Sequence, residues 1–184
     1  GEDKGLVEFL GKPLIEHILA AVAPQVDQIL INANRNQQRY QSYGYPVLTD
    51  ELADYQGPLA GFLTGLRHCQ TRDLVTLPCD GPFVAPDLVE RLLNARLNED
   101  AELAVAHDGE RLQPVYALLN TELTASLNGF LDRGDRKIDL WYAEHRMAKA
   151  DFSDTTDTFA NINRPDDRER LAGLAAAHDL EQAQ

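Results

Sequence analysis

The chain has 184 residues, 43% of them hydrophobic, with a formal net charge of −13 and a pI of about 4.7. This size and composition predict one globular domain over residues 1–184, ending in a tail over 175–184. The acidic balance argues against nucleic acid and anionic membranes as partners, because Lys and Arg bind phosphate-rich surfaces. No apolar run approaches the ~20 residues of a membrane span, and no signal peptide is visible.

Two cysteines, Cys69 and Cys79, form neither a CxxC pair nor a zinc-binding spacing. We interpret both as reduced thiols of a cytoplasmic protein, because reducing compartments keep cysteines unpaired.

The first half of the chain alternates predicted helices and strands. Apolar residues at helical spacing and helix-start signals such as Pro13 indicate the helices. The predicted helices cover residues 11–22, 36–44, 57–69 and 86–97. The predicted strands cover residues 27–34, 45–50 and 73–80. This alternation is typical of a parallel sheet with helices on both faces.

The second half adds mixed pairing to that sheet. Two strand-like runs within 102–120 surround Asp108-Gly109, which indicates a hairpin. Further helices are expected over 121–134, with Thr121 as N-cap, and over 135–145. A last strand over 147–153 and a helix over 165–174 complete the pattern. We therefore expect an α/β fold with a mostly parallel mixed sheet, arranged as a three-layer sandwich.

Polar residues follow three successive predicted strands. Asn32 and Asn34 end the first, Asp50 the second and Asp80 the third. In open α/β sheets, ligands bind beyond the carboxyl ends of the strands. These side chains are therefore expected to line a ligand site at one edge of the sheet.

Asp80 ends the apolar strand of "LVTLPCDGPFV", with Pro78 and Pro82 on either side. A carboxylate in such a place is costly to dehydrate unless a cation meets it. We interpret Asp80 as a Mg²⁺ ligand, because Mg²⁺ is usually held by one or two carboxylates plus substrate phosphates. The alternative is a turn or N-cap aspartate before the helix that begins near Pro86.

Asp50 offers two carboxylate oxygens side by side, which match the N1–H and the amino group of guanine. The alternative is a turn aspartate facing solvent. The amides of Asn32 and Asn34 can bind a base or a ribose, but they also form local Asx turns. We assign Asn32 to the nucleotide and leave Asn34 outside the site.

Three further segments carry weaker signals. Gly57 opens the helix start "GPLAG", where a small residue lets a ligand approach the backbone. Arg133 and Arg136 in "DRGDRK" could clamp a phosphorylated acceptor, or pair with the aspartates of their own loop. Asn161 and Asn163 in "FANINRPDD" are candidates for the acceptor side, and Asn163 could be a second ligand on the magnesium side. The alternative is that one of them caps the following helix.

Six segments share their order and spacing with one known family. They are "DKGLVEFLGKPLIEHIL", "INANR", "LTDELADYQGPLAG", "LPCDGPFV", "QPVYALL" and "FANINRPDD". Together they resemble the molybdenum cofactor guanylyltransferase family, over the chain from Lys4 to about Leu171. The resemblance implies a Rossmann-like nucleotidyltransferase fold and an enzyme that uses Mg²⁺ and a nucleoside triphosphate.

The implied reaction is attack by the terminal phosphate of molybdopterin on the α-phosphate of GTP, with release of pyrophosphate. The resemblance places Lys4, Asn32, Asp50 and Asp80 at GTP-binding positions, and Asp80 also at the metal. The acceptor would lie beside the hairpin and "DRGDRK", with Gln113 at its edge. Molybdenum-insertion proteins and molybdoenzyme chaperones are implied as further partners, and we expect a monomer.

The chain departs from the family pattern at its start. The family opens with a strand and a Gly-rich loop that binds the triphosphate, and neither precedes Lys4 in these residues. Two alternatives therefore stay open. One is a related transferase that uses CTP or a sugar-phosphate acceptor, and the other is a non-catalytic carrier of nucleotide or molybdopterin.

Overall fold

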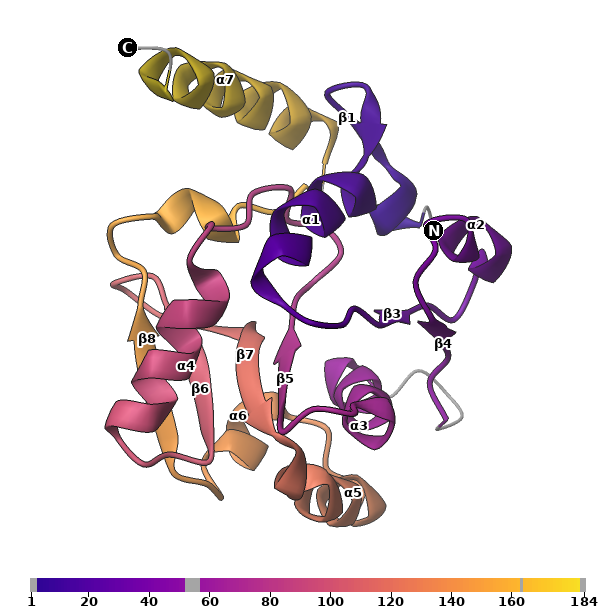
Figure 1. Ribbon diagram of the computed structural model, residues 1–184, viewed down its shortest axis with the longest axis vertical. Coiled ribbons are helices and arrows are strands. Elements are labelled where there is room, and N and C mark those ends of the chain that lie inside the picture. The colour runs from indigo at the N-terminus through magenta and orange to yellow at the C-terminus, as the bar shows by residue number, and fades with distance from the viewer. Residues whose placement is uncertain (1–2, 52–56, 163, 183–184) are drawn as a thin grey trace.

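The strands form three groups in the computed structural model, which describes residues 3–51, 57–162 and 164–182 (Figure 1). The first is an antiparallel pair of β1 (Glu8–Phe9) and β2 (Lys12–Pro13), and the second is a parallel pair of β3 (Ile31–Asn32) and β4 (Val47–Leu48). The third is a four-stranded sheet in the order β5-β7-β6-β8. Its strands are β5 (Asp73–Thr76), β6 (Leu103–His107), β7 (Leu112–Asn120) and β8 (Met147–Asp151).

The four-stranded sheet is mixed. β7 is antiparallel to both β5 and β6, and β6 is parallel to β8. Three of its strands therefore run in one direction and β7 alone runs in the other. The expected hairpin is confirmed, because β6 and β7 pair around the turn at Asp108-Gly109.

Helices cover the sheets and connect the strands. The α-helices are α1 (Leu14–Val22), α2 (Gln37–Gln41), α3 (Pro58–His68), α4 (Leu88–Asn98), α5 (Thr124–Asp132), α6 (Ile138–Tyr142) and α7 (Pro165–Gln182). Short 3-10 helices are η1 (Lys4–Leu6), η2 (Ala23–Gln25), η3 (Thr121–Leu123) and η4 (Thr156–Phe159). No helix among the described residues combines the length and apolar character that a membrane crossing needs.

The alternation of side chains along β6 separates two cores. Leu103 and Val105 face α3, α5 and α6, in a cluster that includes the fully buried Trp141. Ala104 and Ala106 face the other way, toward α4. Successive strand residues point to opposite faces, so one strand contributes to both cores. The helix–sheet–helix sandwich expected from the sequence is confirmed (Figure 1).

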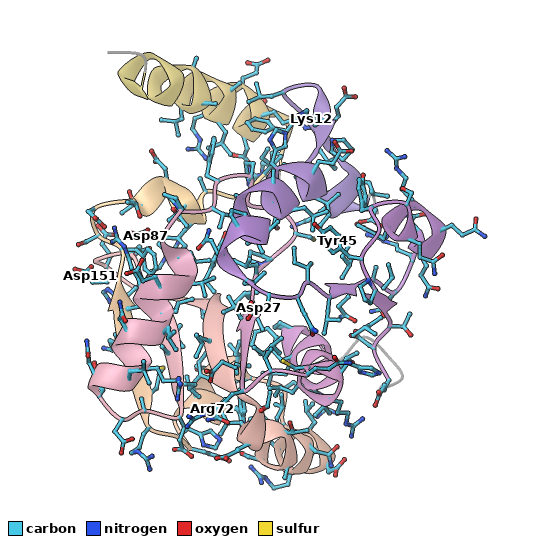
Figure 2. The ribbon with its side chains drawn as sticks, viewed as in Figure 1. Lys12, Asp27, Tyr45, Arg72, Asp87 and Asp151 are labelled. Carbon is cyan, nitrogen blue, oxygen red and sulfur yellow. The ribbon has the colours of Figure 1, made fainter. Side chains whose placement is uncertain are left out.

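Arg91 attaches α4 to the end of β8. Its guanidinium donates to Asp87 at 2.7 Å, to the carbonyl of Asp151 at 3.2 Å and to Asp154 at 2.6 Å. Figure 2 shows Asp87 and Asp151 on the same side of the molecule, with Arg72 at the opposite end of the sheet, just before β5. Arg72 therefore lies at the end of the sheet opposite to the residues that follow β5.

The strands expected over 27–34, 45–50 and 73–80 are shorter in the structure, so Asp50 and Asp80 follow β4 and β5 rather than end them. Three further details differ from the expectations. The helix expected over 165–174 extends to Gln182, and its far end projects from the body of the molecule (Figure 1). A small hairpin, β1–β2, precedes α1 and turns through Leu10 and Gly11, both at positive φ. The expected N-cap at Thr121 is wrong, because the side chain of Asn120 accepts the N–H of Glu122 instead.

Candidate active site

Lys4 and Asp80 form an ion pair next to the end of β5. The ammonium of Lys4 donates to Oδ2 of Asp80 at 2.9 Å, and the Asp80 side chain is only 13% exposed. A carboxylate that is mostly withdrawn from water needs such a cation. The cation that the position of Asp80 requires is therefore supplied, in this structure, by a residue 76 positions earlier in the chain.

A hydrogen bond and close packing fix the backbone around Asp80. The carbonyl of Asp80 accepts the N–H of Ile162 at 2.8 Å. A Cβ atom on Gly81 would lie 2.5 Å from the hydroxyl of Tyr116 and 3.2 Å from Oδ1 of Asn161. Burial, and secondarily the charge of Asp80, raises the pKa of Tyr116, so its hydroxyl stays protonated and donates to the carbonyl of Thr158. No side chain fits at position 81 without displacing these groups.

A second carboxylate, Asp50, is held by neutral amides. Asn32 Nδ2 donates to Oδ1 of Asp50 at 2.7 Å, and Asn34 Nδ2 donates to Oδ2 at 2.7 Å. These residues meet because β3 and β4 are adjacent parallel strands, so their carboxyl ends lie side by side. Gly61 in α3 lies against this group, since a Cβ there would come within 2.8 Å of Asn32 Nδ2.

The chain at residues 3–5 lies between α2 and the segment that holds Cys79 and Asp80. Asp3 accepts the side-chain amide of Asn36 at 2.9 Å and the hydroxyl of Tyr40 at 2.7 Å. A Cβ on Gly5 would lie 2.6 Å from that hydroxyl and 3.5 Å from the Cβ of Cys79. Burial, followed by the contact with Asp3, raises the pKa of Tyr40. Residues 3–5 therefore connect α2 with the ion pair of Asp80.

Gln113 belongs to the same end of the four-stranded sheet as Asp80. The register pairs Thr76, the last residue of β5, with Ala117 of β7, so Gln113 lies farther along in the direction of Asp80. Its amide donates to Asp108 at 2.6 Å. The backbone N–H groups of Arg111 and Glu110 lower the pKa of Asp108 to about 2.

Arg133 and Arg136 make their contacts around the connection between α5 and α6. Arg133 donates to Glu144 at 2.7 Å and lies 3.9 Å from Asp135. Arg136 donates to the backbone carbonyls of Leu131 and Asp135. The pairing of Arg133 with acids of its own neighbourhood corresponds to the structural alternative considered for "DRGDRK".

The remaining predicted site residues have varied surroundings. Gly57 precedes α3 at a φ of 75°, a conformation that favours glycine. The Oδ1 atom of Asn161 is buried beside Gly81 and has no hydrogen-bond partner among the described residues. Asn163 lies outside the described residues, as does part of the "LADYQGPLAG" segment.

The oxygen atoms near Asp80 suit a hard divalent cation. A carboxylate and an amide oxygen are ligand types that Mg²⁺ accepts, and the unpartnered Oδ1 of Asn161 lies next to the residue after Asp80. The described residues contain no group of three or more His, Cys, Asp or Glu side chains that could hold a metal. A cation here would therefore take only one or two protein ligands, with the rest from water or substrate.

Sequence reasoning placed Asn34 at this edge of the sheet but gave it no role at the nucleotide, and it missed Gly81 and Tyr116. A signal existed for Asn34, because residues two apart at a strand end point to the same side, which places it beside Asn32. The signal for Gly81 was its position directly after Asp80. Tyr116 lies 36 residues from Asp80 in the chain, and nothing in the local pattern marks it.

Known proteins of similar sequence share one description. Residues 1–149 match the MobA-like NTP transferase domain. A protein of Shewanella sp. (strain MR-4), named molybdenum cofactor guanylyltransferase, is 54% identical over 94% of this chain and 87% of its own length. A protein of the same name from Shewanella sediminis is 51% identical over 96% of this chain and 90% of its own length.

Solved structures show the same fold at lower identity. Molybdopterin-guanine dinucleotide biosynthesis protein A from Archaeoglobus fulgidus superimposes with a TM-score of 0.78 at 23% identity, over 96% of this chain and 92% of the other. A 2-C-methyl-D-erythritol 4-phosphate cytidylyltransferase from Thermus thermophilus gives 0.72 at 19% identity, over 94% of each chain. The expected Rossmann-like nucleotidyltransferase fold is confirmed. The chain belongs to the MobA-like NTP transferases and, within them, to the molybdenum cofactor guanylyltransferase family.

Proposed function

We propose that this protein transfers GMP from GTP to the terminal phosphate of molybdopterin, which releases pyrophosphate and forms molybdopterin guanine dinucleotide. The observation that carries the proposal is the pair of carboxylates that follow two strands, Asp50 after β4 and Asp80 after β5. One is held by neutral amides and the other by an ammonium group. Family membership supports the same reaction.

Asp50 is the proposed guanine-binding residue. Each of its oxygens accepts one amide hydrogen, from Asn32 or Asn34, and a carboxylate oxygen has capacity for a second. The two remaining positions suit the N1–H and amino group of guanine, whereas cytosine has no such pair of donors. Asn32, exposed beside Asp50, is the proposed second contact to the nucleoside.

Lys4 and Asp80 are the proposed phosphate and metal residues. Asp80 would hold a Mg²⁺ ion, and the Lys4 ammonium would bind phosphate oxygens of GTP. When bound, the metal neutralises and orients phosphate oxygens. Gly57, at the start of α3, leaves room for the nucleotide to approach the backbone.

The transfer forms a bond between an acceptor phosphate oxygen and the α-phosphorus of GTP, and breaks the bond to pyrophosphate. The acceptor phosphate is already ionised near neutral pH, so no general base is needed. The chain contributes position and charge compensation. Gln113, Arg133, Arg136, Asn161 and Asn163 are the proposed acceptor-side residues, and a cytoplasmic monomer remains the expected form.

The test is pyrophosphate release by purified protein of verified N-terminus, with GTP or CTP, with and without molybdopterin, and with and without Mg²⁺. We expect release with GTP only when both molybdopterin and Mg²⁺ are present, and a dinucleotide product by mass spectrometry. Preferential use of CTP would show that the protein transfers a cytidylyl group rather than a guanylyl group. Binding of GTP without any product would favour the carrier alternative.

A further inference from the structure

Asn34 forms two hydrogen bonds with Asp50, one to its carboxylate and one from its backbone N–H. We propose that Asn34 is the positioning residue on which guanine selectivity depends. The inference rests on the proposed function, because it assigns to Asp50 the recognition of guanine. Asn34 itself would not touch the nucleotide. It would act by fixing the orientation of the Asp50 carboxylate plane.

The contact between Asn34 and Asp50 is a closed ring. The Nδ2 atom of Asn34 donates to Oδ2 of Asp50 at 2.7 Å, and Oδ1 of Asn34 accepts the backbone N–H of Asp50 at 2.8 Å. The orientation of the amide is unambiguous, since a backbone N–H can only donate and must face the oxygen of the amide. Both ends of the Asn34 side chain are therefore committed to one residue.

This ring restricts the least constrained torsion of Asp50. The terminal torsion of an aspartate is broad, so a carboxylate held by one contact can rotate about its last bond. Asn32 supplies such a single contact, to Oδ1 at 2.7 Å. Asn34 bridges Oδ2 of Asp50 and the backbone N–H of Asp50. The carboxylate plane is therefore held in one orientation. Two parallel donors of a planar base require that plane to be held.

The alternative considered for Asn34 from the sequence was a local Asx turn. In such a turn the side chain bonds to backbone about two residues further along. The observed partner is instead 16 residues away, at the end of the neighbouring strand. These bonds therefore join the end of β3 to the end of β4, where Asp50 lies.

The residue after Asp50 has an attachment that does not involve Asn34. Arg67 of α3 forms an ion pair with the side chain of Glu51 and also donates to Asn128 of α5. Removing Asn34 should therefore free the Asp50 carboxylate while the ion pair of Glu51 still connects this segment to α3.

The experiment compares GTP with ITP, whose base keeps N1–H but lacks the amino group. We would measure kcat/KM for both nucleotides, with molybdopterin and Mg²⁺, in wild type, Asn34→Ala and Gln38→Ala. Gln38 is a matched control, since it is an exposed amide on α2 near Asn34. We expect Asn34→Ala to lower the ratio of kcat/KM with GTP to kcat/KM with ITP by about ten-fold, the lower end of the effect of one hydrogen bond to a charged group. Gln38→Ala should leave the ratio unchanged.

The ratio separates positioning from folding, because a variant that is partly unfolded loses activity equally with both nucleotides. An equal loss with GTP and ITP in Asn34→Ala would overturn the role of Asn34 and leave the proposed function intact. The same holds if wild type uses GTP and ITP equally well. A wild-type protein that produces no dinucleotide from GTP would instead overturn the proposed function itself.

Discussion

The two carboxylates at the strand ends differ in what holds them. Asp80 faces the ammonium of Lys4 at 2.9 Å, whereas Asp50 receives two amide hydrogens at 2.7 Å. An ammonium compensates the charge of Asp80, and under the proposed function Mg²⁺ would take that place. Neutral amides orient Asp50, and under the proposed function the N–H donors of guanine would complete its hydrogen bonds.

The backbones of the two residues are also held differently. Asp80 follows the four-stranded sheet and is bonded through its carbonyl to Ile162, with Tyr116 packed behind Gly81. Asp50 follows a strand of only two residues and is held mainly through side chains. Backbone contacts therefore fix the position of Asp80, whereas side-chain hydrogen bonds fix the position of Asp50.

The largest effect is expected from Asp80→Asn, which removes the charge but keeps the shape. We expect kcat for pyrophosphate release to fall roughly 100- to 1,000-fold, because charge compensation at the reacting phosphates is lost. Asp100→Asn is the matched control, since Asp100 is exposed at the end of α4 and its positive φ of 48° suits asparagine. Comparable activity of the two variants would remove Asp80 from the metal site.

The next largest effect is expected from a change in the proposed contact with the guanine base. Asp50→Asn should lower kcat/KM for GTP by roughly 10- to 100-fold, since an amide cannot accept two N–H donors side by side. Residual activity with CTP should change much less. Steady-state kinetics with both nucleotides would check this, and an equal loss with GTP and CTP would contradict base recognition by Asp50.

Gly81→Ala tests the backbone support of Asp80. The added Cβ would lie 2.5 Å from the Tyr116 hydroxyl, which is buried, so Asp80 must shift or the packing must loosen. We expect a loss of about 1–3 kcal/mol in the free energy of unfolding, together with reduced activity. Urea denaturation measures the first.

Tyr116→Phe in the Gly81→Ala background provides the control. Removing the hydroxyl removes the atom that the new Cβ meets, so part of the stability and activity should return. A double variant no better than Gly81→Ala would show that the clash with Tyr116 is not the cause.

The smallest effect concerns Asp108, a carboxylate held mainly by two backbone N–H groups, with the amide of Gln113 as a further donor. Its pKa is about 2 in the folded protein and about 3.8 ordinarily, so its charge stabilises the fold above about pH 4. This contribution is lost as the pH falls toward 2. We expect Asp108→Asn to lower stability at neutral pH by less than about 1 kcal/mol, because solvent screens the group.

Urea unfolding of wild type and Asp108→Asn at neutral and acidic pH would test this. The difference in stability should shrink as the pH falls. A difference that stays constant would show that the amide, and not the lost charge, is responsible.

Much of the fold followed from local patterns. The amphipathic spacing of α1, α3 and α4 and the Asp-Gly turn between β6 and β7 were readable because their periods repeat over several residues. The β1–β2 hairpin was not, because strands of two residues show no alternation. The cap at Asn120 was missed because Thr121 is also a capping type, and only its bond to the carbonyl of Arg72 shows that it is otherwise engaged.

The sequence alone determined six of the segments that contain strands and that carboxylates follow two of them, because alternation and strand ends are local properties of the chain. Only the tertiary structure decided the partner of each carboxylate. Lys4 reaches Asp80 across 76 residues, and Asn34 reaches Asp50 across 16. These pairings depend on which strand ends the packing brings together, and no periodicity along the chain encodes that.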